Sequence, residues 1–296
     1  MTDGLLIAGG EADPCLPVLA AAARRLGLEP LLLLHGAGTE PAITWDLDAD
    51  RLIVDGRDLA PAAVFLRYDV FGGRAPAGSL DRAAAWYATV QGWASAHPAV
   101  GQFNRELAAH GSVKPAELAL ARSLGLATPR TVITNHLAAL QADRAFSPDA
   151  AIAKPVAGGS YVRRLDRVLA EFEDEGATAP MPAIVQECLA YPELRVFLVK
   201  GEAHVFEIRS RHIDYRPHLD NAMDYLGAPE SLAPTLDKLR LLAGAIGCDF
   251  CACDLKSRPG ETEPVFLEIN TGPMFAAFDA NSGGTLAEAM VRALLR

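Results

Sequence analysis

The chain has 296 residues, of which 50% are hydrophobic and 22% are charged, and its formal net charge is −10. The composition is globular, and the length is enough for more than one domain. The negative charge argues against nonspecific binding to nucleic acid or to an anionic membrane. No apolar run reaches the roughly 18 residues that a membrane span needs. Because the N-terminus also lacks the basic start of a signal peptide, we expect a cytoplasmic protein.

Strands and helices alternate over the first hundred residues. We expect strands over residues 5–8, 30–34 and 63–66, helices over residues 14–26 and 80–95, and a small hairpin over residues 51–57. This alternation favours a small, mainly parallel α/β layer. Gly9-Gly10 follows the first strand, but no G-x-G-x-x-G pattern is present. A tight turn is therefore favoured there over a dinucleotide site.

The second part of the chain begins with a polar segment, residues 101–112, which we interpret as a linker. The elements expected after it are a helix over 115–124, a strand over 131–134, a helix over 136–143 capped by Asn135, a strand over 151–154 and a charged helix over 166–175. Antiparallel strands are then expected over 183–188, 193–199 and 203–209, and helices over 233–246 and 285–295. There is no internal repeat.

The most informative segment is the apolar strand over residues 265–270, in which Glu268 and Asn270 alternate with hydrophobic residues. Residues two apart in a strand point to the same face. Residues 256–264 read as a loop between two antiparallel strands, which sets Asp254 opposite or nearly opposite Glu268. Three oxygen donors on neighbouring strands suit Mg²⁺. The alternative is a hairpin whose polar residues face solvent, but the complete set favours the metal.

Five cysteines are present, and Cys248, Cys251 and Cys253 cluster in the sequence. The odd count and the missing export signal argue against a disulfide framework. A structural zinc site normally has four ligands in two spaced pairs, and no second pair lies nearby. We therefore favour buried small hydrophobic residues over a zinc site.

Two further segments are typical of nucleotide binding. Lys154 ends an apolar strand before the glycine-rich turn that contains Gly158, Gly159 and Ser160, where backbone N–H groups and an ammonium could hold phosphate. The Walker pattern is absent, so this signal alone is weak and a simple turn is the alternative. Gln186 and Glu187 end a later strand, which could offer backbone groups to an adenine edge, although such a segment taken alone is more often just a strand end.

Arginines gather around the later strands, at positions 195, 209, 211 and 216. Guanidinium groups bind carboxylates and phosphates in a forked geometry. In an acidic protein these arginines suggest a pocket for a triphosphate or an acidic substrate. The alternative for each of them is a solvated arginine that pairs with a surface acid.

Taken in order, these segments resemble the ATP-grasp ligases over residues 104–296. Within that superfamily the chain is similar to the branch of ribosomal-protein glutamate ligases, glutathione synthetases and graspetide (microviridin-type) peptide macrocyclases. The motifs that carry the resemblance are Lys114, Ile152-Ala153-Lys154-Pro155 with Gly158-Gly159, Gln186-Glu187, Glu193-Leu194-Arg195, Asp254 and Glu268-Ile269-Asn270. The macrocyclase side is suggested by Asn104-Arg105, by Lys114-Pro115, by Phe65-Leu66-Arg67 and by Asp214-Tyr215-Arg216, which is similar to an Asp-Trp-Arg triplet.

The resemblance implies an α/β (α+β) protein with the ATP-grasp fold and an N-terminal Rossmann-like pre-ATP-grasp domain. The implied divisions are residues 1–103 for that domain, 104–182 for the central ATP-grasp subdomain and 183–296 for the C-terminal subdomain with the magnesium site.

The resemblance also implies roles for individual residues. The ATP-binding set comprises Lys114, Lys154, Gly158, Gly159, Ser160, Gln186, Glu187, Leu189 and Glu193. Within it the lysines contact phosphates, Gln186, Glu187 and Leu189 line the adenine site, and Glu193 reaches the ribose. The catalytic set that faces the transferred phosphate or the carboxylate comprises Arg195, Arg209 and Arg216. One or two Mg²⁺ ions, or Mn²⁺, would be held by Asp254, Glu268 and Asn270.

The expected reaction is the ATP-dependent activation of a carboxylate as an acyl phosphate, followed by amide or ester formation with an amine or a hydroxyl. A precursor peptide is one candidate substrate, and a homodimer is left open. Three alternatives remain. A small-molecule kinase would share the nucleotide residues, and a noncatalytic nucleotide-binding protein would bind ATP without turnover. An NAD-linked enzyme would depend on Gly9-Gly10 alone.

Overall fold

The computed structural model describes residues 4–36, 38, 40–71, 79–107, 113–137, 140, 146–156, 161–172, 178–218 and 220–296. Two segments singled out from the sequence lie wholly or largely outside them, namely Gly158-Gly159-Ser160 and the helix expected over 136–143. The chain forms two compact units. Unit 1 comprises Met1–Ala108, Cys248–Phe250 and Gly272–Arg296, and unit 2 comprises Ala109–Gly247 and Cys251–Thr271. The three-part division expected from the sequence stays a prediction.

The centre of unit 1 is a parallel sheet in the strand order β2-β1-β6-β7. Its strands are β1 (Leu5–Gly10), β2 (Leu31–His35), β6 (Ala63–Leu66) and β7 (Gly101–Gln102). The parallel layer was predicted, but the polar linker expected over 101–112 was wrong at its start, because Gly101 and Gln102 pair with β6. A Cβ at Gly101 would lie 1.9 Å from the Leu294 carbonyl oxygen, so this close approach of two backbones requires glycine.

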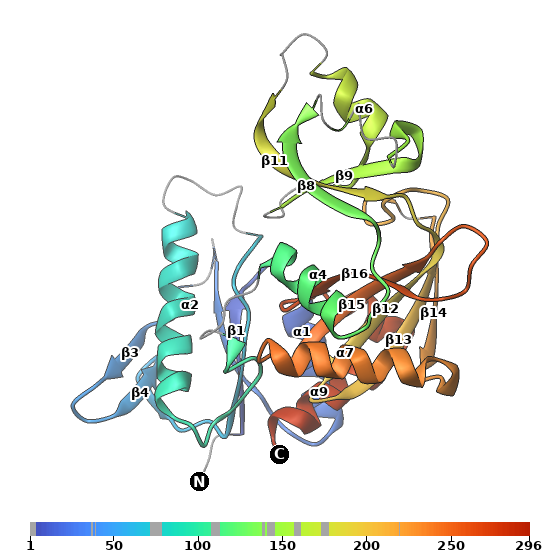
Figure 1. The fold of residues 1–296 in the computed structure, drawn as a ribbon. Helices are drawn as coiled ribbons and strands as arrows, with labels where there is room; N and C mark the ends of the chain where they lie inside the picture. Colours follow the sequence, from blue (N-terminus) through green and yellow to red (C-terminus); the bar gives the residue numbers. More distant parts are fainter. Residues whose placement is uncertain are drawn as a thin grey trace. The chain divides into compact units, whose positions relative to one another are not determined.

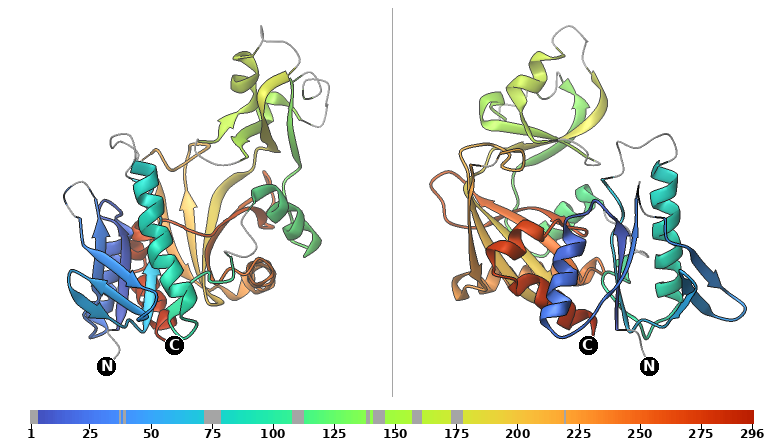
Figure 2. Two further views of the ribbon diagram at one scale, coloured as in Figure 1. Left: turned by 90° about the vertical axis from the view of Figure 1, so that its left-hand side faces the viewer. Right: turned by 180° about the vertical axis from the view of Figure 1, so that it is seen from behind.

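Both faces of this sheet are covered (Figures 1 and 2). One face carries α2 (Ser79–Ala96) and a small antiparallel sheet of β3 (Ile43–Asp46), β4 (Arg51–Val54) and β5 (Arg57–Leu59). The other face carries α1 (Cys15–Arg25), α8 (Ala276–Asn281) and α9 (Thr285–Leu294). The turn predicted at Asp55-Gly56 is confirmed, with φ values of 49° and 77° that suit a tight hairpin.

Asn104 ties two distant segments of unit 1 together. Its Nδ2 donates to the Phe250 carbonyl at 2.8 Å, and its Oδ1 accepts from the backbone N–H groups of Asp249 and Phe250 at 2.9 and 2.8 Å. Its φ of 56° is left-handed, a conformation that asparagine tolerates better than most residues. The side chain quoted for the macrocyclase resemblance therefore has a structural role here.

Unit 2 contains two antiparallel sheets. The first has the order β10-β9-β11-β8, with β8 (Thr131–His136), β9 (Ala151–Pro155), β10 (Arg163–Arg164) and β11 (Thr178–Glu187). Helix α6 (Leu165–Ala170) follows β10 and buries Leu165 and Leu169 against Ala153 and Val185. Asn135 was expected to cap a helix, which was wrong. Strand β8 continues through it, and its Nδ2 donates to the Ala179 carbonyl of β11 at 3.0 Å.

The second sheet of unit 2 has the order β14-β13-β12-β15-β16. Its strands are β12 (Ala190–Val199), β13 (Glu202–Arg209), β14 (Ala222–Gly227), β15 (Phe250–Ser257) and β16 (Val265–Asn270). Helix α4 (Lys114–Ser123) packs against β16, and α7 (Ala233–Ala245) buries three leucines at helical spacing, Leu236, Leu239 and Leu242. Strand β14 was not predicted, because at this edge its residues alternate between exposed and half-buried rather than buried positions.

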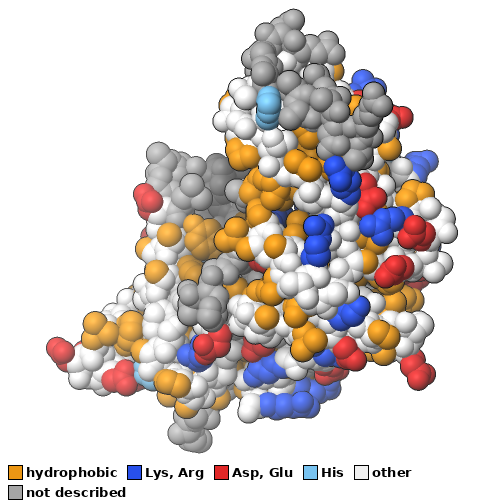
Figure 3. Space-filling model, viewed as in Figure 1, with side chains coloured by type: hydrophobic (Ala, Val, Ile, Leu, Met, Phe, Trp, Pro, Cys, Tyr) orange, Lys and Arg blue, Asp and Glu red, His pale blue; other side chains and the backbone are white. Residues whose placement is uncertain are grey.

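Cys248, Cys251 and Cys253 are buried, which confirms their prediction as buried small hydrophobic residues. Acidic and basic side chains are interspersed on the face of the molecule in Figure 3.

Among the helices that the structure describes, none combines the length and the apolarity needed to cross a bilayer.

Candidate active site

The hairpin of β15 and β16 brings the three expected oxygen donors to one face of the second sheet. Asp254 lies directly opposite Glu268, and Ala252 lies opposite Asn270. Residues that face each other on antiparallel strands share a face, as do residues two apart on one strand. The pairing of the hairpin is therefore as predicted. Its loop is shorter than expected, because β15 continues through Lys256 to Ser257.

Two lysines from separate elements meet at the Glu268 carboxylate. Lys114, the first residue of α4, places Nζ 3.1 Å from Oε2, and Lys154, on β9, places Nζ 3.5 Å from the same oxygen. Burial lowers the pKa of Lys154, although Glu268 acts against this shift. Burial also acts to raise the pKa of Glu268, but the two ammonium groups outweigh it and hold that pKa below its usual range. Glu268 is therefore a carboxylate in a strongly cationic setting.

Arg195 of β12 pairs with Asp254 inside the sheet. Its Nη1 donates to both carboxylate oxygens, at 2.9 and 3.1 Å, and both side chains are nearly buried. Burial raises the pKa of Asp254 even though the guanidinium opposes that shift. A buried ion pair of this kind gains little net stability, since desolvation offsets the attraction. Its retention is more typical of a functional site than of a packing solution.

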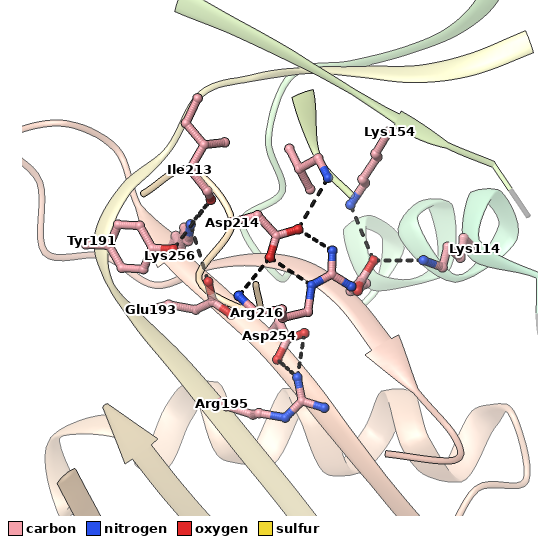
Figure 4. A network of polar contacts seen from close by, with 12 residues as sticks. Lys114, Lys154, Tyr191, Glu193, Arg195, Ile213, Asp214, Arg216, Asp254 and Lys256 are labelled. Carbon is pink, nitrogen blue, oxygen red and sulfur yellow. Dashed lines mark hydrogen bonds and ion pairs between the residues drawn. The ribbon is translucent and has the colours of Figure 1, made fainter. Parts of the chain in front are cut away.

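The third cluster lies on the loop after β13, where Asp214 holds Arg216. The backbone N–H and the Nε of Arg216 donate to Asp214 Oδ1 at 3.1 and 2.8 Å, and Arg216 Nη2 donates to Oδ2. Oδ2 also accepts from the backbone N–H of Val162 at 3.3 Å. Figure 4 shows this pair between Lys154 and Asp254. The bond to Asp214 raises the pKa of Arg216, so the guanidinium remains charged.

Lys256, which was expected in a loop, lies on β15 and completes the network. Its Nζ lies 3.3 Å from Glu193 Oε2 and 3.8 Å from the centre of the Tyr191 ring. Burial raises the pKa of Glu193 to about 7, with a further contribution from Asp254. Lys256 follows Asp254 by two residues, so strand alternation was the signal that could have placed it on the same face as Asp254.

The expected adenine residues lie on and after β11. Gln186 is fully buried, and its Nε2 donates to Thr131 Oγ1 at 3.0 Å. Its Oε1 has no partner among the described residues. Gln186 faces Ile152 in register and Ile184 faces Lys154, so Gln186 and Lys154 share the face of the sheet opposite α6.

Glu187 and Leu189 are placed differently from Gln186. The Glu187 carboxylate accepts from the Arg130 backbone N–H at 2.9 Å and from Arg258 Nη2 at 3.0 Å. Its side chain thus links the end of β11 to the β15–β16 hairpin. Leu189 lies between β11 and β12, the strands that connect the two sheets of unit 2.

Arg209 is the expected site residue that the structure does not bring to the cluster. Its guanidinium is half exposed and pairs with Glu207 and Asp224. Glu193 and Arg195 lie opposite Ile208 and Phe206 in register, so Arg209 and Glu207 point to the other face of the sheet. Gly158, Gly159 and Ser160 lie outside the described residues.

The remaining residues fit a nucleotide with a divalent cation. Asp254, Glu268 and Asn270 offer only oxygen ligands on one face, which is the donor set that Mg²⁺ prefers. Lys114 and Lys154 supply positive charge at the same point, and the unpartnered Gln186 Oε1 on the Lys154 face can accept from an exocyclic amine. The arrangement thus offers oxygen donors that a cation would need, positive charge that phosphates would need and an acceptor that a base would need.

No protein-family model and no curated protein matches the chain. Several solved structures match the chain. The ATP-grasp ligase PsnB in complex with a minimal precursor is 23% identical over 99% of both chains, with a TM-score of 0.73. Macrocyclase MdnC from Microcystis aeruginosa MRC, bound with the precursor peptide MdnA, is 19% identical over 99% of both chains, with a TM-score of 0.75. D-alanine–D-alanine ligase from Bacillus anthracis is 15% identical over 99% of this chain and 96% of that chain, with a TM-score of 0.60.

These likenesses cover 99% of the chain. The α/β fold class expected from the sequence is confirmed, and the chain has the ATP-grasp fold.

Proposed function

We propose that the protein is an ADP-forming ligase that joins a carboxylate to an amine or a hydroxyl. The observation that carries this proposal is the meeting of Lys114, Lys154 and Asp254 around Glu268. Two ammonium groups from separate elements converge on a carboxylate that another carboxylate faces. Such a cluster suits a triphosphate bound with a divalent cation, and it lies in the ATP-grasp fold.

In this proposal Asp254, Glu268 and Asn270 hold Mg²⁺. The ion supplies charge neutralisation on the triphosphate when bound. Lys114 and Lys154 bind phosphate oxygens, and Glu193 accepts from a ribose hydroxyl. Gln186, Glu187 and Leu189 form the adenine end, with the unpartnered Gln186 Oε1 as its acceptor.

The chemistry has two steps. The substrate carboxylate oxygen attacks the γ-phosphorus of ATP, and the bond from that phosphorus to the β,γ-bridging oxygen breaks. ADP is released, and the substrate carboxylate becomes an acyl phosphate. The amine or hydroxyl then attacks the acyl carbon, loses its proton, and displaces inorganic phosphate. Arg216, held by Asp214 close to Lys154 in Figure 4, stabilises charge on the transferred phosphoryl group. Arg195 holds Asp254 in place and opposes the rise that burial causes in its pKa. No side-chain nucleophile is needed.

We propose a peptide as the substrate that supplies the carboxylate and its acceptor. The support is the likeness to PsnB and MdnC, which are described in complexes with a precursor or a precursor peptide. The likeness to D-alanine–D-alanine ligase supports a ligase but not a peptide substrate. Whether the product is an amide or an ester depends on the acceptor.

The test is a coupled assay of ADP release with ATP, Mg²⁺ and candidate peptides that contain acidic side chains together with lysine, serine or threonine. We expect ADP and phosphate in equal amounts, and a peptide product lighter by one water for each bond formed. A product heavier by one phosphoryl group would identify a kinase instead. Nucleotide binding without turnover of any carboxylate substrate would support a noncatalytic protein.

A further inference from the structure

Lys256 is a nearly buried lysine whose ammonium group meets three different acceptors. Nζ lies 3.3 Å from Glu193 Oε2, 3.4 Å from the Ile213 carbonyl oxygen and 3.8 Å from the centre of the Tyr191 ring. An ammonium has three N–H donors, so a carboxylate, a carbonyl and an aromatic face account for all of them. Only 9% of the side chain is exposed. These three groups together form a binding site for one positive charge.

The three acceptors belong to the two segments that the proposed reaction needs in place. Tyr191 and Glu193 lie on β12, and Glu193 is the expected ribose ligand. Ile213 immediately precedes Asp214, which holds Arg216. Lys256 itself lies on β15, two residues beyond Asp254. Figure 4 shows Lys256 between Tyr191, Glu193 and Ile213. One ammonium therefore links β12, β15 and the Arg216 loop.

We propose that Lys256 is a positioning residue that fixes Glu193 for the ribose and the Ile213–Arg216 segment for the transferred phosphate. This inference rests on the proposed function. Lys256 is no catalytic residue, because its donors are turned to protein groups. Removing it leaves the buried Glu193 without its nearest counter-charge and takes one of two donors from the Ile213 carbonyl, the other being the Tyr191 hydroxyl at 3.4 Å. A buried charge that loses its partner reorients or becomes neutral, and Glu193 then no longer recognises a hydroxyl in a fixed geometry.

The experiment compares wild type with Lys256→Met, Glu193→Gln and the double variant, using calorimetric binding of Mg-ATP, Mg-2′-deoxy-ATP and Mg-3′-deoxy-ATP. We expect wild type to prefer ATP over at least one deoxynucleotide by about tenfold, as for a hydrogen bond to a charged group. Lys256→Met should reduce that preference to nearly one. The double variant should lose no more of the preference than either single variant, because both changes remove the same contact.

Turnover supplies a second readout. Lys256→Met should raise KM for ATP and also lower kcat, since it releases the loop of Arg216, whereas Glu193→Gln should act mainly on KM. Lys256→Arg keeps a positive charge and should recover part of the nucleotide preference. Lys200→Met is the matched control, because Lys200 is exposed on the turn between β12 and β13. It should leave binding and turnover unchanged.

The outcomes separate this inference from the proposed function. If wild type binds no ATP analogue, the proposed function fails. If wild type binds ATP but Lys256→Met keeps both affinity and preference, only the role of Lys256 is overturned. A uniform loss of affinity for all three nucleotides would also overturn it, because a merely structural lysine would give that result. If Lys256→Met does not fold, Lys256→Gln is measured and judged by the same preference.

Discussion

Arg195 and Asp254 are joined by two hydrogen bonds from one guanidinium nitrogen, in a part of unit 2 that almost no solvent reaches. The pair lies one strand away from Glu268, the carboxylate at which Lys114 and Lys154 meet. A guanidinium thus lies at the first of two facing carboxylates, and two ammonium groups lie at the second. Burial and these charges together raise the pKa of Asp254 and lower the pKa of Glu268.

Breaking the pair from one side should cost stability as well as activity. Asp254→Asn leaves a buried guanidinium without its carboxylate, for which we expect a loss of about 3–5 kcal/mol in the free energy of unfolding. Urea denaturation without nucleotide measures this loss. The double variant Arg195→Met, Asp254→Leu should recover most of the stability but none of the turnover. Equal stability of Asp254→Asn and wild type would contradict the assigned burial.

Glu268→Gln tests the metal site separately from folding. The amide keeps the volume of the side chain but removes the charge that two ammonium groups share, so ADP release should fall by at least about 100-fold. The thermal midpoint should change little, because Glu268 is partly exposed. Lys154→Met should lower turnover to a similar extent. Normal turnover in both variants would refute the site.

Arg209 and Arg216 form a matched pair for the catalytic assignment. Arg216→Ala should reduce kcat by about 100-fold or more, since its guanidinium lies beside Lys154 and Asp254. Arg209→Ala removes only exposed ion pairs on the other face of the sheet, and it should change kcat/KM by less than about threefold. Steady-state kinetics of ADP release decides between them. A large loss in Arg209→Ala would restore that residue to the catalytic set.

Glu193 should make stability depend on pH. Its pKa is raised to about 7 in the folded protein, so between the ordinary pKa near 4.5 and pH 7 the folded state binds more protons than the unfolded state. Stability from this group is present below that window and is lost as pH rises through it, by up to about 3 kcal/mol. Glu193→Gln mimics the protonated acid and removes this loss. Urea denaturation of both proteins at pH 5 and pH 8 measures the effect. The same change in stability between the two pH values for wild type and Glu193→Gln would contradict the prediction.

Asn104 provides a test that concerns the fold alone. Asn104→Ala removes three hydrogen bonds to residues 249 and 250, and we expect a loss of about 2 kcal/mol or more. Asn104→Gly loses the same bonds but tolerates the φ of 56°, so it should be more stable than the alanine variant by about 1 kcal/mol. Thermal unfolding measures both. Turnover per folded molecule should remain close to that of wild type.

The pairing of the β15–β16 hairpin could be predicted from the sequence, because strand alternation and one loop are local signals. To place Asp254 opposite Glu268, only the two-residue period of a strand and a turn between the two strands were needed. The face of the sheet to which Arg209 points depends on the register of β12 against β13, and no local pattern in the sequence determines that register. Lys256 was assigned to the loop because no local signal before Pro259 marks where β15 ends. Asn135 is a good cap in isolation, but its contact with Ala179 comes from a strand more than forty residues away.

Unit 1 is assembled from the beginning and the end of the chain, since α9 packs beside α1 and β6. Its hydrophobic interior cannot close during synthesis until α9 has left the ribosome. Unit 2 is complete once residue 271 has emerged, so the segment with the acidic hairpin can fold first. A nascent chain arrested when residue 271 has emerged but α9 is still inside the ribosome should therefore protect unit 2 from protease while unit 1 is still cleaved.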